Sequence, residues 1–253
     1  MNTMLHLVIT LVVSLAAIGP LAGARWVWRS PRTGILLWQL LMLTIVLCVL
    51  GIAFLTIPEL GVTVAIALVG VATHHWLGTL RTRRRHRDVL SLVARVDAAV
   101  PGVLVLDHPL TVAYCVPGLR PRVVLSSGAL AALTRPELAA VLAHERAHAK
   151  ERHDLVLLPF LVLRPIFPTA AASVALLVEM RADECAAPSP LATALRRFTA
   201  VVPPGALGIV DAAVLARLQR LAGTREPLPA LVRWGVVLAG LTLVTTPLSF
   251  LVW

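Results

Sequence analysis

Residues 134–148, TRPELAAVLAHERAH, decide how this chain is interpreted. Thr134 can cap a helix at its N-terminus, and Glu137, three residues later, completes the T-x-x-E pattern of a capping box. Pro136 suits the first helical turn, and leucine and valine side chains then recur at helical spacing towards His144. The stretch therefore predicts a helix that has one apolar face and carries two histidines near its end.

The two histidines of this helix, His144 and His148, stand four residues apart and so share one face. Both imidazoles can reach a single metal ion there, as in zinc sites. Glu145 lies next to that face, where its carboxylate can take a proton from an attacking water molecule. A solvated helix with two unrelated histidines is the alternative, but the helix cap at the correct distance upstream argues against it. The pattern predicts one Zn²⁺ per chain and Glu145 as the catalytic base.

A catalytic zinc ion needs a third protein ligand. The stretch EMRADE, residues 179–184, offers Glu179 for this role, which would give a site of two histidines and one glutamate. Asp183, one helical turn later, can orient a ligand imidazole from behind. Glu184 and His153 are alternative third ligands. Peptide hydrolysis also needs a group that stabilises the oxyanion, and His153 and Arg152 are the candidates for it.

The composition indicates a membrane protein. Hydrophobic residues make up 58% of the 253 residues and charged residues 14%, whereas a soluble domain carries about 25% charged residues. Basic residues outnumber acidic residues by 23 to 13, and they cluster at the ends of apolar runs rather than along one polar face. This distribution favours contact with membrane lipids and disfavours direct binding of nucleic acid.

Four segments are long enough to cross a bilayer, which takes about 20 apolar residues. They are Leu5–Leu21, Ile35–Ile57, Gly61–Leu80 and Trp234–Trp253. The basic clusters lie in the connections before and after these segments, at Arg25–Arg32, Arg81–Arg87 and Arg217–Arg233. Because such clusters stay in the cytoplasm, we expect a multi-pass protein of the inner or plasma membrane with both termini outside.

These spans predict three parts: a membrane domain at 1–80, a cytoplasmic peptidase domain at 81–233 and a last transmembrane helix at 234–253. Short apolar runs followed by the histidine helix predict an α+β fold for the cytoplasmic part, with strands at 103–107, 112–115 and 122–126. The proline-containing segment 187–208 predicts an irregular connection, and 211–221 predicts a short helix.

Residues 155–177 are apolar enough to be mistaken for a further span. A single crossing would put Glu179 across the membrane from His148, although ligands lie about 2 Å from their zinc ion. Arg164, Pro165 and Pro168 interrupt the stretch, and each half is too short to cross about 30 Å of hydrocarbon. We therefore expect an apolar hairpin at 155–178 that is buried in the domain or dips into the inner leaflet.

The chain from 113 to 186 resembles the BlaR/MecR-type membrane metallopeptidases, which act as antirepressors. The resemblance rests on RVVLSSG at 122–128, on LT at 133–134 and EL at 137–138, on VLAHERAH at 141–148 and on HD at 153–154. The related HtpX-like and prenyl-protein proteases share the H-E-x-x-H helix and the later E-x-x-x-D. The resemblance implies a gluzincin-like fold, with Glu179 as third zinc ligand and Asp183 as its supporting carboxylate.

The same resemblance implies that an edge strand holds the substrate in extended form, contributed by Tyr114 and Cys115 or by Val123, Val124 and Leu125. It also implies a protein substrate, such as a winged-helix repressor, that is cleaved in regulated proteolysis. General quality control of membrane proteins and a non-enzymatic signalling scaffold with a vestigial metal site are the alternatives. The sequence ends at Trp253, directly after the last span, so we expect no extracellular penicillin-binding sensor domain and no direct sensing of β-lactams.

Overall fold

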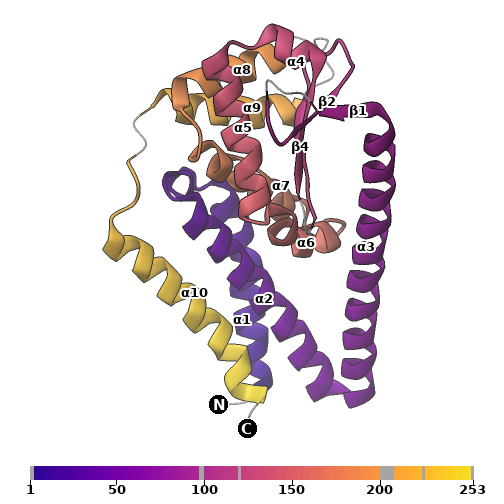
Figure 1. Cartoon of the computed structure of the whole chain (residues 1–253). Coiled ribbons are helices and arrows are strands. Elements are labelled where there is room, and N and C mark those ends of the chain that lie inside the picture. The colour runs from indigo at the N-terminus through magenta and orange to yellow at the C-terminus, as the bar shows by residue number, and fades with distance from the viewer. Residues whose placement is uncertain (1–2, 97–99, 119–120, 200–207, 224–225, 252–253) are drawn as a thin grey trace. The chain divides into compact units, whose positions relative to one another are not determined.

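The computed structural model describes residues 3–96, 100–118, 121–199, 208–223 and 226–251 (Figure 1). The chain divides into two compact units. The helical unit comprises residues 1–76, 159–178 and 226–253, and the mixed unit comprises residues 77–158 and 179–225.

The helical unit is built around helix α2 (Pro31–Thr56), which packs against α1 (Thr3–Gly23) and α10 (Ala230–Leu251). A short 3₁₀ helix, η1 (Arg25–Arg29), joins α1 to α2. Glycines let these helices approach closely, because a Cβ atom at Gly51 would lie 2.9 Å from Leu7 and one at Gly240 would lie 2.8 Å from Leu40. Trp38 of α2 is fully buried.

Four helices are long and apolar enough to cross a membrane, namely α1, α2, α3 (Pro58–Val93) and the part of α10 from Ala230 to Leu248. They coincide with the four segments predicted from the sequence, so the chain is a multi-pass membrane protein. The last two residues of the fourth predicted span, 252–253, lie outside the described residues. Helix α3 continues without a break for 13 residues beyond its predicted end at Leu80.

The apolar stretch at 155–177 is not one helix. It forms α6 (His153–Leu163) and the first part of α7 (Pro168–Asp183), with residues 164–167 between them. These helices have 11 and 16 residues, and at about 1.5 Å per residue neither reaches across a hydrocarbon core of about 30 Å. The interruption lies where Arg164 and Pro165 predicted it.

The mixed unit contains a four-stranded sheet of order β1-β2-β4-β3. Strands β2 (Val103–Leu106), β3 (Ala113–Val116) and β4 (Arg122–Ser126) match the three predicted strands, whereas β1 (Ala94–Val96) escaped prediction because it has only three residues. Strand β4 pairs in parallel with β2 and antiparallel with β3.

This strand order decides between the two candidate edge strands. Because β4 is paired on both sides, Val123, Val124 and Leu125 do not lie at an edge of the sheet. Strand β3, with Tyr114 and Cys115, lies at the edge of the sheet.

Helices cover one face of this sheet. Helix α5 (Arg135–Lys150) packs on β3, β4 and α8 (Pro188–Thr199), and α8 packs on α9 (Gly208–Ala222), as Figure 1 shows. A short helix, α4 (Ser127–Ala132), links β4 to α5. The core between them is built from apolar side chains that include Val103, Leu125, Val141, Leu191 and Leu221. On the other face of the sheet, Leu90 of α3 packs with Val116 and Val124.

Helix α8 corrects one prediction. The prolines in 187–208 indicated an irregular connection, but Pro188 and Pro190 stand in the first turn of α8, where no backbone N–H is needed. The helix is stabilised by burial of Leu191 and its neighbouring alanines. Residues 200–207 of that segment lie outside the described residues. The short helix predicted at 211–221 is confirmed as α9.

The predicted capping box of α5 is confirmed. One carboxylate oxygen of Glu137 accepts hydrogen bonds from the backbone N–H of Thr134 at 2.7 Å and from its hydroxyl at 2.9 Å. The other oxygen accepts a hydrogen bond from Nε of Arg197 on α8 at 3.1 Å. Glu137 therefore fixes where α5 begins and links that end to α8.

We predict that Gly128→Ala destabilises the mixed unit. An added Cβ at this position would lie 2.0 Å from the carbonyl oxygen of Pro109, and the N–H of Gly128 already donates to His108 at 3.0 Å. Because backbone must move, we expect a loss of at least about 1–3 kcal/mol, seen as a lower melting temperature in detergent. Gly223→Ala is the control, since its nearest neighbour, Gln219, would lie 3.5 Å away. Equal melting temperatures for both variants would contradict the prediction.

Candidate metal centre

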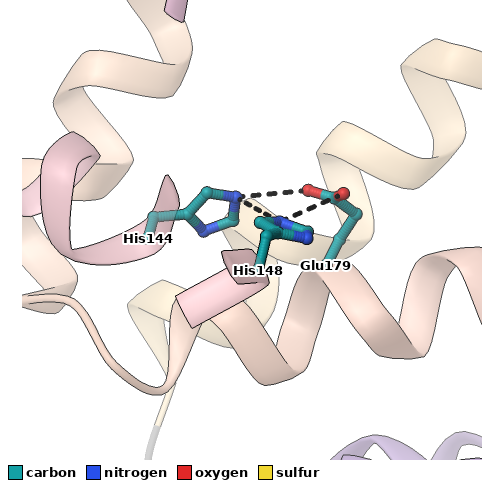
Figure 2. Close-up of side chains that lie close together, drawn as sticks. All are labelled: His144, His148 and Glu179. Carbon is teal, nitrogen blue, oxygen red and sulfur yellow. Dashed lines mark hydrogen bonds and ion pairs between the residues drawn. The ribbon is translucent and has the colours of Figure 1, made fainter. Parts of the chain in front are cut away.

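Three side chains of the mixed unit point towards one another, His144 and His148 from α5 and Glu179 from α7 (Figure 2). The Nε2 atoms of the two histidines are 3.2 Å apart. One oxygen of Glu179 lies 3.4 Å from Nε2 of His144, and the other lies 3.5 Å from Nε2 of His148. The helical spacing of α5 accounts for the pair of histidines, and the end of α7 brings the carboxylate to them.

These distances fit a zinc ion. Zinc binds imidazole nitrogen and carboxylate oxygen at about 2.0–2.2 Å in tetrahedral geometry, so neighbouring ligand atoms stand roughly 3.3–3.5 Å apart. The observed separations of 3.2–3.5 Å match this value. A set of two histidines and one glutamate also leaves the fourth position open, as a catalytic zinc site requires.

The acidic groups around this set favour cation binding. Burial opposes protonation of His144, but its contacts with the negatively charged Asp183 and Glu179 together outweigh burial and raise its pKa to about 9. Burial lowers the pKa of His148 to about 4. Burial alone would raise the pKa of Glu179, yet His144 and Arg217 bring it down to about 2. Zinc binding at neutral pH therefore displaces a proton from His144.

Asp183 lies behind His144, as expected of a supporting carboxylate. Its Oδ1 atom is 3.0 Å from Nδ1 of His144, on the side of the ring away from the other two ligands, and its side chain is only 1% exposed. Contact with Asp183 favours the orientation of the ring in which Nε2 faces His148 and Glu179.

Arg217 on α9 is the residue of this centre that sequence reasoning missed. Its guanidinium donates two hydrogen bonds to Asp183, at 2.6 and 2.9 Å, and forms an ion pair with Glu179 at 2.9 Å. From the sequence alone, Arg217 is one of the basic residues that precede the last span. The available signal was a group of three carboxylates at 179–184 with a single arginine among them, because buried carboxylates need cations from elsewhere in the chain.

The two alternative third ligands lie elsewhere. Glu184 is engaged by Arg181 at 2.6 Å and also by Arg220. His153 contacts the outer nitrogen of His148, Nδ1, at 3.0 Å and is not one of the three clustered ligands. Arg152 pairs with Asp154 at 3.5 Å. In the described part of the chain, neither His153 nor Arg152 lines the cavity at this centre.

That cavity has a volume of about 160 Å³ and two different walls. Polar residues form one wall, namely His144, Glu145, Glu179 and Arg217, and apolar residues form the other, namely Ala113, Val141, Leu191, Leu195 and Phe198. The carboxylate of Glu145 accepts a hydrogen bond from the backbone of Cys115. Burial is the main reason that the pKa of Glu145 is raised, and the charge of Glu179 adds to the effect.

We predict about one zinc ion per purified chain, lost when a ligand is removed. His144→Ala, His148→Ala and Glu179→Ala should each reduce the zinc content sharply, as measured by elemental analysis after dialysis. Glu184→Ala is the matched control for Glu179→Ala, because Glu184 is held by arginines outside the cluster. Zinc retained in Glu179→Ala and lost in Glu184→Ala would show that the third ligand is Glu184.

Comparison with known families agrees with this geometry. Residues 79–216 match the family described as Peptidase family M48. The match covers more than half of the chain and includes all three clustered ligands, whereas Arg217 lies one residue beyond it. No solved structure matches the chain. The chain therefore belongs to peptidase family M48, and it is a zinc metalloendopeptidase in which His144, His148 and Glu179 fit the zinc site.

Proposed function

We propose that this membrane endopeptidase uses Glu145 as its general base and cleaves a cytoplasmic or membrane-proximal protein. The observation that carries the proposal is the position of Glu145 in the wall of the cavity that also contains the zinc ligands. Its carboxylate is not one of the clustered ligands, since it stands one residue off the face that His144 and His148 share. A carboxylate that lies beside the metal ion without binding it can accept a proton and donate it again.

The reaction follows from these residues. Zinc, when bound, polarises the scissile carbonyl and makes water a stronger acid. A carboxylate oxygen of Glu145 takes the proton of the attacking water and passes it to the leaving amine. The raised pKa of Glu145 supports the first step, because a stronger base takes the proton of water more readily.

Arg217 is the cation that supports the developing oxyanion in this proposal, instead of His153 or Arg152. It lines the cavity, and it remains charged: burial opposes its charge, but the hydrogen bond to Asp183 and the charges of Asp183, Glu179 and Glu145 together outweigh burial and raise the pKa of the guanidinium. A fixed cation near a carbonyl oxygen stabilises the charge that develops there during hydrolysis.

The outer edge of β3 is a suitable place for the substrate backbone. Val112 accepts a hydrogen bond from Ser126, and Tyr114 pairs with Val124, so the backbone of these alternate residues faces β4. The backbone of Ala113 and Cys115 then faces outwards. Ala113 also lines the cavity, so we propose that an extended peptide pairs with β3 there. The apolar wall would accept an apolar side chain beside the scissile bond.

The regulatory part of the proposal rests on the resemblance to antirepressor peptidases at residues 113–186. On that basis we propose that the substrate is a transcriptional repressor of the winged-helix type. A general quality-control protease is the rival, and the two differ in substrate range. The first should change the amount of one or a few proteins, whereas the second should change the amounts of many membrane proteins.

We also propose an orientation. Basic clusters flank the candidate spans at 25–32, 81–87 and 217–233, and all of them fit the cytoplasmic side. A membrane domain at 1–80, a cytoplasmic peptidase domain at 81–233 and a last span at 234–253 follow, with both termini outside. The arginines at 81–87 continue along α3 directly after its apolar part, where they can contact anionic lipid headgroups.

Glu145→Gln should separate catalysis from zinc binding. The substitution keeps the size of the side chain but removes the base, so zinc content and melting temperature should persist while peptide hydrolysis falls at least about 100-fold. Glu226→Gln is the matched control, because Glu226 is exposed and lies outside the mixed unit. Quantitative proteomics of both strains should show the substrate accumulating only with Glu145→Gln. Unchanged hydrolysis and unchanged protein turnover in the Glu145→Gln variant would contradict the proposed role of Glu145.

Reporter fusions test the orientation. Fusions after Arg87 and after Gly223 should both report the cytoplasm, because basic residues flank both positions, and a fusion after Trp253 should report the outside. A cytoplasmic C-terminus would contradict the four-span arrangement. An external signal after Gly223 would instead mean that the stretch at 155–178 crosses the membrane.

A further inference from the structure

Each of the two zinc-binding histidines has a partner at the ring nitrogen that faces away from the other ligands. For His144 that partner is the carboxylate of Asp183. For His148 it is a third histidine, His153, at the start of α6. The partner of His148 is therefore an imidazole and not a carboxylate. A neutral imidazole accepts a hydrogen bond only at the ring nitrogen that carries no proton.

The contact between His148 and His153 is close and buried. Their Nδ1 atoms are 3.0 Å apart, and their rings meet edge to face, with an angle of 86° and centroids 4.7 Å apart. His153 is only 3% exposed. Nε2 of His148 faces the other ligands, so the two nitrogens of this ring have separate partners.

The zinc site determines which atoms in this contact carry protons. A neutral histidine that binds a metal through Nε2 carries its proton on Nδ1, so His148 must donate to His153. Nδ1 of His153 then accepts, and its own proton must be on Nε2. That atom lies 3.6 Å from a carboxylate oxygen of Glu151, which is beyond hydrogen-bond distance, so Glu151 acts on it through its charge alone. His148 is therefore the donor and His153 the acceptor, and the proton of His153 lies on the side of Glu151.

Two features of the backbone and its surroundings hold this arrangement in place. Arg152, between α5 and α6, has a φ of 51°, a left-handed conformation that turns the chain so that His153 follows α5 directly and contacts His148. Such a conformation is unfavourable for a residue other than glycine, so the surrounding contacts must hold it. Glu151 is fixed by two N–H groups of Arg181 on α7, the helix that also carries Glu179.

We propose that His153 is a positioning residue for zinc: it accepts the Nδ1 proton of His148 and so fixes the tautomer and the ring orientation in which Nε2 faces the metal. The negative charge of Glu151 favours the proton of His153 on the far nitrogen, which leaves Nδ1 available as the acceptor. The proposal rests on the zinc site of this peptidase and is independent of the role of Glu145. It gives His153 a role different from both a third ligand and an oxyanion stabiliser.

Two amide substitutions test the hydrogen bond without removing polarity. The oxygen of Asn at this position can occupy the place of Nδ1, whereas Gln reaches the place of Nε2. We expect His153→Gln and the apolar His153→Leu to raise the zinc dissociation constant roughly 10–100-fold, and His153→Asn to restore it to near the wild-type value. The measurement is competition with a chelating indicator, on the full chain in detergent. His86→Leu, at an exposed histidine outside the centre, is the control.

The visible spectrum of the Co²⁺-substituted protein supplies a second reading. The three His153 variants should keep the spectrum of a site with two histidines and one glutamate, whereas His148→Ala should change it. Wild-type affinity in His153→Gln and His153→Leu would overturn the proposal. Equally weak binding by the Asn and Gln variants would show that packing, and not the hydrogen bond, is what matters. A changed spectrum in His153→Asn would make His153 a ligand.

Discussion

The metal centre depends on the contacts that the guanidinium of Arg217 makes with Asp183 and Glu179. This one cation neutralises both carboxylates that α7 brings to the two histidines. Asp183 is almost fully buried, and a buried carboxylate without a partner costs several kcal/mol. Without this arginine, the two acids would repel one another and Glu179 could not keep its position beside His144. The helix α9 that carries Arg217 is therefore part of the zinc site, although it supplies no ligand.

The histidine helix depends in the same way on contacts at both of its ends. Glu137 caps its start and also binds Arg197, so the position of α5 is linked to α8, whose apolar side chains form a wall of the cavity. Beyond its last residue, the turn at Arg152 brings His153 to the ring of His148. A metal site requires ligand atoms placed to within a few tenths of an ångström, and contacts at both ends provide that precision.

Helices α7 and α3 each contain residues of both units. Helix α7 begins among residues of the helical unit and ends with Glu179 and Asp183 in the mixed unit. Helix α3 runs unbroken from a candidate span to Leu90, which packs on the sheet. At these two points the chain therefore passes from one unit to the other within a helix.

The sequence by itself determined whatever depends on residues close together in the chain. Four spans, the cap at Thr134 and the shared face of His144 and His148 follow from helical spacing and hydropathy. Only the tertiary structure decided that β3 is an edge strand of the sheet and that 188–199 is a helix. It alone also decided that His153 contacts the outer nitrogen of His148. Arg217 reaches Asp183 across 34 residues, and such a contact depends on how helices pack, which local spacing does not specify. Local periodicity sets which way a side chain points along its own helix, and packing sets what it meets.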